Sequence, residues 1–450
     1  MPSKQLLLKA LKNGATTRIP WVPFVGVHCA NILNITATEY LQNGENIAKG
    51  ILAAIELYKP DGIPVVFDLQ LEAEILGCAL QWADKLPPAV ISHPLENMEL
   101  DALPEFSTQR GRYLEIAKAC RLIKAKIKDD IALYGLITGP FTLALHLLGN
   151  NIFLDMLNNQ QKLKEVLSFC TEVGIKSADF YIANSCDIIA VVDPMISQIS
   201  PEHFRQFCAP YLNEIFDYIR SKDRLSSLFV CGDATRNLED MCKTNCDNIS
   251  IDENISLEYL KNLSRKYTKS FGGNLRLTST LLFGSKLESQ QNALECMQIG
   301  EKHGFILAPG CDLPYDCPQE NLIAITEIVH DDYKKQIAEA LIADLEEKPE
   351  TLVELEDYTA NEKVIIEVIT LDSGSCPPCY YMVDAVKKAT TELKDKVEIR
   401  EYKISTKIGL AYMKALKVKA IPTICINGEI AFSSIIPDVD SLKAKIREHL

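Results

Sequence analysis

Short apolar runs alternate with longer segments of helical periodicity through the first two thirds of the chain. The runs contain few polar positions, which is typical of parallel strands that are buried on both faces. The segments between them, such as residues 44–58 and 200–221, place apolar side chains on one helical face. The pattern predicts eight strands, at residues 22–27, 63–68, 132–137, 187–193, 226–231, 248–252, 269–275 and 304–309.

Eight strands connected by helices favour an α/β fold, a (β/α)8 barrel of the TIM type. An open, doubly wound sheet is the alternative, because the number of strands alone does not exclude it. In a barrel, the carboxyl ends of the strands form the active face. Polar or reactive side chains gather at those ends, namely His28, Cys29, Asp68, Asp193, Cys231, Asp252, Asn274 and Cys311. A single Asp or Asn there more often caps a helix or forms a turn, so the prediction of a site depends on the whole group.

A charged helix at residues 331–350 and a connector at 351–361 follow the barrel, and the pattern changes from residue 363. We expect a barrel domain at residues 1–345, a linker at 346–361 and a second domain at 362–450. The second domain has the order strand, helix, strand, helix, strand, strand, helix, and a Cys-x-x-Cys motif follows its first strand. This order predicts a thioredoxin-like fold.

The composition places the chain among soluble globular proteins. Hydrophobic residues make up 47% of the 450 positions and charged residues 24%, enough apolar surface for a large core. The net charge of −14 disfavours nucleic acid as a partner. No apolar run reaches the ~18 residues that cross a bilayer, and residues 1–18 read as an amphipathic helix without an export signal. We therefore expect no membrane partner and a cytoplasmic protein, whose 15 cysteines are mostly reduced and buried.

A pair of cysteines marks the start of the first helix in the second domain. Cys376 stands at the helix N-terminus, where free N–H groups and the helix dipole favour a thiolate. Two residues separate it from Cys379, which puts both sulfur atoms within reach of a disulfide. Half of a zinc ribbon is the alternative, but no second Cys-x-x-Cys lies nearby in the sequence.

Together with Ala420-Ile421-Pro422-Thr423, this motif closely resembles the thioredoxin family. The resemblance covers residues 362–450 and implies a redox-active pair, in which Cys376 is the attacking thiol and Cys379 the resolving thiol. It also implies that Pro422 is a cis-proline that packs against the two cysteines.

The barrel contains recognisable motifs at residues 60–78, 136–144, 198–204, 229–235, 272–275, 281–285 and 304–322. These segments resemble the uroporphyrinogen decarboxylase superfamily, and most closely its corrinoid-dependent methyltransferases. The resemblance implies transfer of a methyl group from a methylated corrinoid protein to a small thiol, such as coenzyme M, or to a pterin. The sequence lacks a cobalamin-binding motif, so we expect the corrinoid on a separate partner protein. True decarboxylases bind the carboxylates of their substrate through arginines near the N-terminus, but this sequence has no arginine between Arg18 and Arg110. A tetrapyrrole decarboxylase is therefore the weakest interpretation.

The resemblance also implies a zinc site. Methyltransferases of this branch bind zinc through a His-x-Cys pair and a distant cysteine, which correspond here to Cys231 and Cys311, with Phe229 in the histidine's place. His28 is a candidate third ligand, because the first and last strands of a closed barrel are neighbours. Zinc would hold the incoming thiol and make it a nucleophile at neutral pH.

The same face supplies the residues that we expect to bind the substrate. They are Asp68, Glu72, Glu74, Asp193, Asp233 and Asn274. Glu72, Glu74 and Asp233 are also candidate replacements for the missing ligand, and either glutamate could act as a general base. The alternative for the two glutamates is a solvated helix start that the helix dipole favours.

Three functions compete at this point. The leading hypothesis is a methyltransferase whose thioredoxin-like domain keeps Cys231 and Cys311 reduced or delivers a thiol or disulfide substrate. The second is a thiol–disulfide oxidoreductase whose barrel is a scaffold for a corrinoid or a partner, and Phe229 motivates it. In that case mutation of Cys376, but not of Cys231, would abolish activity. The third is a non-catalytic binder of a corrinoid or a corrinoid protein.

Overall fold

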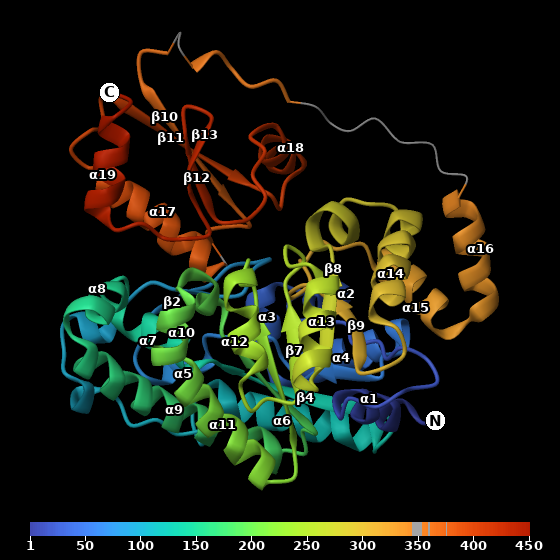
Figure 1. Cartoon of the computed structure of the whole chain (residues 1–450). Coiled ribbons are helices and arrows are strands. Elements are labelled where there is room, and N and C mark those ends of the chain that lie inside the picture. Colours follow the sequence, from blue (N-terminus) through green and yellow to red (C-terminus); the bar gives the residue numbers. More distant parts are fainter. Residues whose placement is uncertain (344–352, 359–360, 375) are drawn as a thin grey trace. The chain divides into compact units, whose positions relative to one another are not determined.

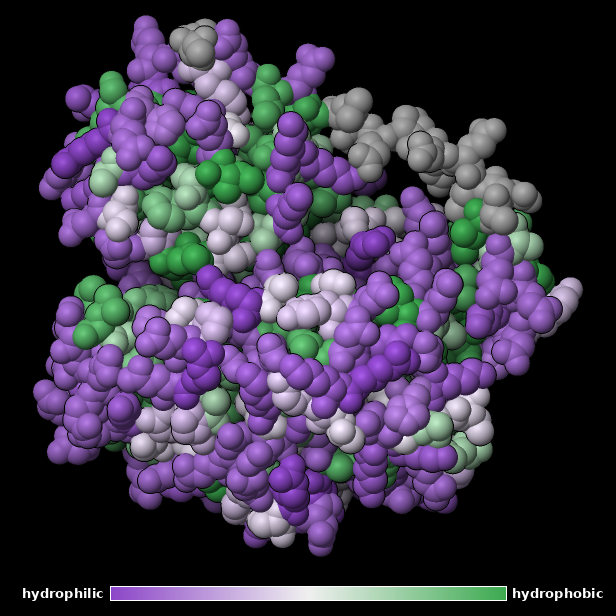
Figure 2. Space-filling model, in the orientation of Figure 1, coloured by the Kyte–Doolittle hydropathy of each residue, from purple (hydrophilic) through white to green (hydrophobic). Residues whose placement is uncertain are grey.

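The computed structural model describes residues 1–343, 353–358, 361–374 and 376–450. The chain forms two compact units, one built mainly from residues 1–343 and the other from the C-terminal part (Figure 1). The linker expected at residues 346–361 falls partly on positions outside the described residues. The face drawn in Figure 2 is mainly hydrophilic, with apolar residues in small groups. Within the described residues, no helix has the length and apolar character needed to cross a bilayer.

A parallel sheet forms the centre of the first unit. Its strands are β1 (Gly62–Pro64), β4 (Ala132–Thr138), β5 (Ile188–Val192), β6 (Leu225–Val230), β7 (Asn248–Ile251), β8 (Ser270–Leu275) and β9 (Phe305–Pro309). They pair in this order and every neighbouring pair is parallel. These strands match seven of the eight predicted segments and confirm the TIM-like α/β fold.

The eighth segment closes the ring without forming a strand. Trp21 makes an isolated parallel bridge to Leu307 of β9, and the Asp61 N–H before β1 donates to the Trp21 carbonyl at 2.9 Å. The predicted strand at residues 22–27 is therefore wrong. Pro20 and Pro23 lack the N–H groups that a strand ladder needs, and the chain enters a helix at His28.

A side chain supplies part of the missing pairing. Asp61 is fully buried, and its carboxylate accepts hydrogen bonds from both terminal nitrogens of Arg18, at 2.6 and 2.7 Å. The same carboxylate accepts the N–H of Trp21 at 2.9 Å. Asp61 thus holds the closing segment against the start of β1.

Helices surround the sheet (Figure 1). They are α1 (Ser3–Leu11), α2 (His28–Leu33), α3 (Ala37–Leu41), α4 (Gly44–Tyr58), α5 (Leu71–Ile75), α6 (Arg112–Ile127), α7 (Pro140–Leu148), α8 (Asn151–Asn158), α9 (Gln160–Ala183), α10 (Pro201–Phe207), α11 (Ala209–Ser221), α12 (Leu238–Cys242), α13 (Leu257–Tyr267), α14 (Lys286–Gly300), α15 (Gln319–His330) and α16 (Asp332–Ala343). A hairpin of β2 (Leu80–Gln81) and β3 (Ala89–Val90) precedes α6. Side chains fix several helix starts, as where Asn43 caps α4. The segment 200–221 forms two helices rather than one, since Pro210 lies in the first turn of α11.

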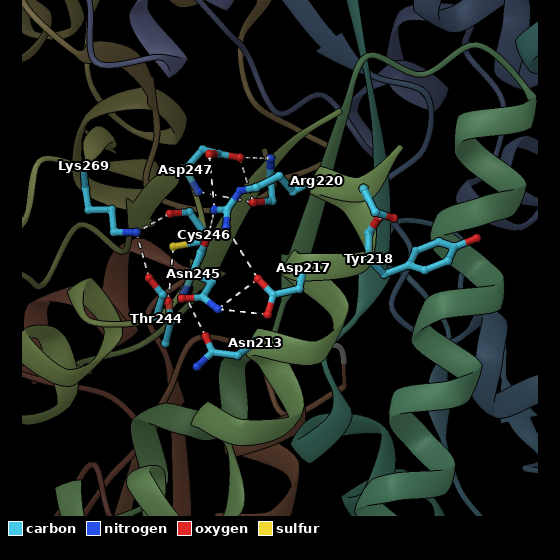
Figure 3. Close-up of polar contacts among 11 residues, drawn as sticks. Asn213, Asp217, Tyr218, Arg220, Thr244, Asn245, Cys246, Asp247 and Lys269 are labelled. Carbon is cyan, nitrogen blue, oxygen red and sulfur yellow. Dashed lines mark hydrogen bonds and ion pairs between the residues drawn. The ribbon is translucent and has the colours of Figure 1, made fainter. Parts of the chain in front are cut away.

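Polar contacts tie together the amino ends of β6, β7 and β8 (Figure 3). The Asp247 carboxylate accepts the Ser226 N–H at 2.8 Å, and Lys269 donates to the carbonyls of Thr244 and Cys246 at 2.7 and 2.5 Å. The Asn245 amide donates to Asp217 of α11 at 2.9 Å. This end of a barrel usually serves stability, whereas the opposite end carries the chemistry.

The second unit has the thioredoxin fold. Its elements are β10 (Val364–Thr370), α17 (Pro377–Ala389), β11 (Val397–Lys403), α18 (Lys407–Ala415), β12 (Thr423–Ile426), β13 (Glu429–Ser433) and α19 (Val439–Arg447). The sheet order is β11-β10-β12-β13, with β11 parallel to β10 and the other two pairs antiparallel. Buried side chains of β10, α17 and α19 pack together as its core. The predicted fold is confirmed.

Candidate active site

Two cysteines from distant segments meet at the carboxyl ends of the barrel strands. Cys231 follows β6 directly, Cys311 stands two residues after β9, and their Sγ atoms lie 2.6 Å apart. Both are half-buried and pack against the apolar cluster inside the barrel. Every other free cysteine that the structure describes is buried. The structure therefore brings the two predicted sulfur ligands together at the active face.

The surroundings of this pair favour the neutral thiol. The hydrogen bond with Cys311 and burial raise the pKa of Cys231 well above its usual value. The nearby carboxyl groups of Asp252 and Asp312 raise it further through their charge. Cys317, which stands six residues after Cys311, is buried and donates to the Leu281 carbonyl at 3.2 Å.

Aromatic rings fill the position of the expected histidine. Phe229 is 2% exposed, and its ring centroid lies 5.1 Å from that of Phe24 and 6.0 Å from that of Phe67. Phe229 and Cys231 are two residues apart, so both side chains point toward the barrel interior. Phe229 therefore contributes packing at this place and no metal-binding atom.

His28 is occupied by a different contact. It is fully buried at the start of α2, and its Nε2 shares a hydrogen bond with the hydroxyl of Tyr58 at 2.7 Å. Burial lowers the pKa of His28 to about 4, so the ring is neutral at pH 7. The structure does not assemble His28 and the two cysteines into one site: across the described residues, no group of three or more His, Cys, Asp or Glu side chains could hold a metal ion.

A catalytic zinc site takes three protein ligands, each cysteine as a thiolate. Cys231 and Cys311 offer two sulfur atoms, and the pKa of Cys231 is raised. The residues present therefore do not fit a resident zinc ion of the family type.

A buried ion-pair network holds two of the predicted carboxylates. Arg112, the first residue of α6, pairs with Asp68 through Nη1 and donates from Nε to Glu74 at 2.7 Å. Its guanidinium lies 4.9 Å from the ring centroid of Trp82. Asp68 is 2% exposed and Arg112 7% exposed. Glu74 is thus half-buried and paired, not part of a solvated helix start.

Glu72 and Asp193 are both fully buried. Thr138 at the end of β4 donates its hydroxyl to Glu72 at 2.8 Å, and burial raises the pKa of that carboxyl. The Asp193 carboxylate accepts the hydroxyl and the N–H of Thr142 at 2.5 and 2.9 Å, and also the N–H of Phe141. Burial raises the pKa of Asp193 to about 6. Because these N–H groups open α7, Asp193 acts as a helix cap.

The last two predicted residues differ in surroundings. Asn274 is 8% exposed, and its amide donates to the carbonyls of Asp252 and Ile255 at 3.1 and 2.8 Å. The peptide bond that precedes it, from Gly273, is cis. Asp233 is half-buried, two residues after Cys231.

Three further residues lie at the same face, and the sequence did not predict them as site residues. Arg112 has no local sequence signal, since its partners precede it by 44 and 38 residues. Asp312 follows Cys311 and accepts the Gly26 N–H at 2.7 Å, and burial raises its pKa. Burial and the charge of Asp252 raise the pKa of Glu253 to about 8. The place of Asp312 and Glu253 just after β9 and β7 was the available signal.

The second unit carries its own sulfur pair. Cys376 caps α17 and is half-buried, whereas Cys379 is buried; the two are joined, with Cα atoms 5.2 Å apart. The Leu371 N–H donates to the Cys379 sulfur at 3.3 Å. The Ile421–Pro422 peptide bond is cis, and the Pro422 carbonyl accepts the Ser434 N–H at 2.9 Å.

Comparison with known proteins now gives this fold and site a family. The model of the uroporphyrinogen decarboxylase (URO-D) family matches residues 2–331, and a thioredoxin domain model matches residues 364–447. The chain belongs to the uroporphyrinogen decarboxylase family and carries a C-terminal thioredoxin domain.

Its relatives include methyltransferases. The methylcobamide:CoM methyltransferase MtbA of Methanosarcina acetivorans is 26% identical over 331 residues, which are 72% of this chain and 96% of the relative. MtaA of Methanosarcina barkeri, also a methylcobamide:CoM methyltransferase, is 26% identical over the same shares of both chains. A solved methyltransferase from Methanosarcina mazei superposes with a TM-score of 0.68 at 26% identity, covering 74% of this chain and 99% of that one. This similarity supports methyltransferase activity for the barrel.

Proposed function

We propose that the barrel transfers a methyl group between a methylated corrinoid, carried by a separate partner protein, and a small thiol or pterin acceptor. The contact between Cys231 and Cys311 at the carboxyl ends of the strands carries this proposal. The names of the relatives, methylcobamide:CoM methyltransferases, support the same donor and acceptor classes. The expected zinc ion lacks a third protein ligand among the described residues, so the proposal does not include it.

The proposed reaction is a displacement at carbon. With a thiol acceptor, a sulfur–carbon bond forms while the cobalt–carbon bond breaks, its electron pair stays on the corrinoid, and the thiol proton leaves to a base or to water. Cys231 and Cys311 would contact the acceptor, because they are only half-buried at the active face. Asp68, Glu74 and Arg112, which form an ion-pair network, would position the substrate. Glu72, Asp193 and Asn274 would act by holding the strand ends.

The test uses the full chain with methylcobalamin as donor and coenzyme M or tetrahydrofolate as acceptor. We expect formation of the methylated acceptor together with the absorbance change of the demethylated corrinoid. Cys231→Ser and Cys311→Ser should each lower the rate by at least tenfold. Cys317→Ser is the matched control, since it keeps a hydrogen-bond donor toward the Leu281 carbonyl and should leave the rate unchanged. No transfer by the wild-type chain to either acceptor would contradict the proposal.

A second activity is favoured by a separate observation. Cys376 is half-buried at the N-terminus of α17, whereas Cys379 is buried. We propose that this pair catalyses thiol–disulfide exchange. Reduction of a protein disulfide such as that of insulin should be lost in Cys376→Ser and kept in Cys231→Ser. If Cys376→Ser also abolished methyl transfer in excess reductant, the scaffold hypothesis for the barrel would replace the first proposal.

A further inference from the structure

The cysteine pair of the barrel has a geometry that differs from a shared metal site. Two sulfur atoms bound to one zinc ion, each at about 2.3 Å in a tetrahedral arrangement, would stand roughly 3.8 Å apart. Cys231 Sγ and Cys311 Sγ lie 2.6 Å apart, in direct contact. The Phe229 ring fills the third ligand's position with carbon. The two sulfur atoms therefore face each other rather than a common ion.

Access separates this pair from the other thiols. Cys231 and Cys311 are half-buried, whereas the remaining free cysteines of the described chain are buried. Attack on a disulfide requires a thiolate to approach one sulfur along the sulfur–sulfur axis. A buried cysteine therefore cannot take part in thiol–disulfide exchange with an external reagent. The barrel thus presents one pair of sulfur atoms that is both mutually close and partly exposed.

The same chain supplies a reagent of the right class. Cys376 caps α17, where the helix N-terminus favours the thiolate. Cys379 lies three residues on, with its Cα 5.2 Å from that of Cys376, within the range of a disulfide. This arrangement suits an attacking thiol with a resolving thiol behind it.

We propose that Cys231 and Cys311 form a reversible disulfide, and that the Cys376/Cys379 dithiol of this protein reduces it. The proposal goes beyond methyl transfer, because it identifies a substrate for the thioredoxin domain. The barrel disulfide forms when the two thiols reduce a small-molecule disulfide to two thiols. While it persists, neither barrel sulfur is available to an acceptor.

The exchange balances in atoms and electrons. The Cys376 thiolate attacks one sulfur of the barrel disulfide, a mixed disulfide forms, and the other barrel sulfur leaves as a thiolate that takes up a proton. Cys379 then loses its proton and attacks Cys376, which releases the second barrel thiol. Two electrons and two protons pass from the Cys376/Cys379 pair to Cys231 and Cys311. An external dithiol restores the Cys376/Cys379 pair for the next cycle.

The test traps the mixed disulfide in the full chain. In Cys379→Ser the resolving thiol is absent, so the intermediate should accumulate after the reduced protein is treated with a stoichiometric amount of diamide. Peptide mapping should then find Cys376 joined to Cys231 or Cys311. Cys376→Ser should show no such link. Adding Cys317→Ser to the trap should leave it unchanged, since Cys317 is buried.

Alkylation of the wild-type chain gives the second readout. Oxidation should remove two alkylatable thiols beyond those of the Cys376/Cys379 pair, and the protected residues should be Cys231 and Cys311. The proposal is overturned if both barrel thiols stay alkylatable while Cys376 and Cys379 are oxidised, or if the trap contains no link from Cys376 to either barrel cysteine. Both readouts are masses and do not depend on methyl transfer. The disulfide proposal can therefore succeed where the methyl-transfer proposal fails, and the reverse.

Discussion

The carboxylate of Asp68 and the guanidinium of Arg112 form a buried ion pair across 44 residues of sequence. Breaking a buried pair leaves one uncompensated charge, which costs about 3–5 kcal/mol. Arg112→Met should therefore lower the free energy of unfolding by that amount in denaturant titrations. Lys85→Met, which breaks the exposed pair with Asp316, is the control and should cost less than about 1 kcal/mol. Equal losses in the two variants would contradict the role of burial.

Phe229→His should create the metal site that the wild-type chain lacks. Position 229 lies on the same inward face as Cys231, so an imidazole there would stand beside the two sulfur atoms. We expect the variant to bind about one zinc ion per chain, with two sulfur ligands and one nitrogen ligand at the zinc absorption edge. Phe229→Leu is the control and should bind none. Tight stoichiometric zinc in the wild-type protein would contradict the role assigned to Phe229.

Thr138→Val should destabilise the barrel by about 1–3 kcal/mol. The substitution removes the hydroxyl that donates to Glu72 at 2.8 Å and leaves a fully buried carboxyl without that partner. Thr138→Ser keeps the hydroxyl and should recover most of the loss. The measurement is equilibrium unfolding at one pH, and a Thr138→Val variant as stable as the wild type would contradict the role of the hydroxyl.

Asp193 should make the barrel more stable as the pH falls from about 6 to about 4. Its pKa is raised from 3.8 to about 6 by burial, so in this window the folded state holds a proton that the unfolded state lacks. Its contribution to the free energy of unfolding should rise by up to about 1.4 kcal/mol per pH unit. The difference between wild type and Asp193→Asn, measured across this window, isolates that contribution. A difference that shrinks on acidification would mean that the folded-state pKa is low.

The sequence predicted most strands of the barrel correctly, but not the structure of the segment at residues 22–27, which closes the barrel. Seven apolar runs became strands because each is bounded by turn residues and flanked by helical patterns. The run at 22–27 carries the same composition, but Pro23 removes a backbone donor and His28 begins α2. A hydropathy pattern does not show that proline lacks a backbone N–H, so the pattern predicted a strand at residues 22–27.

The site divides in a similar way. The contact of Cys231 with Cys311 follows from strand order, because both residues stand at the carboxyl ends of barrel strands. The partners of Glu74 and His28 do not follow, since Arg112 and Tyr58 lie on helices whose rotation about the barrel the sequence does not specify. Ion pairs of this kind depend on the final packing of the helices.

The side chain of Asp61 alone makes several of the contacts that close the barrel. Where other neighbouring strands share a ladder of backbone bonds, the junction with β1 combines a backbone bond from Asp61 to Trp21 with a carboxylate that binds Arg18 and Trp21 together. A single substitution removes at most a few bonds from a backbone ladder, but substitution of Asp61 removes every bond that its carboxylate makes. Substitution of Asp61 would therefore remove three hydrogen bonds of this junction at once.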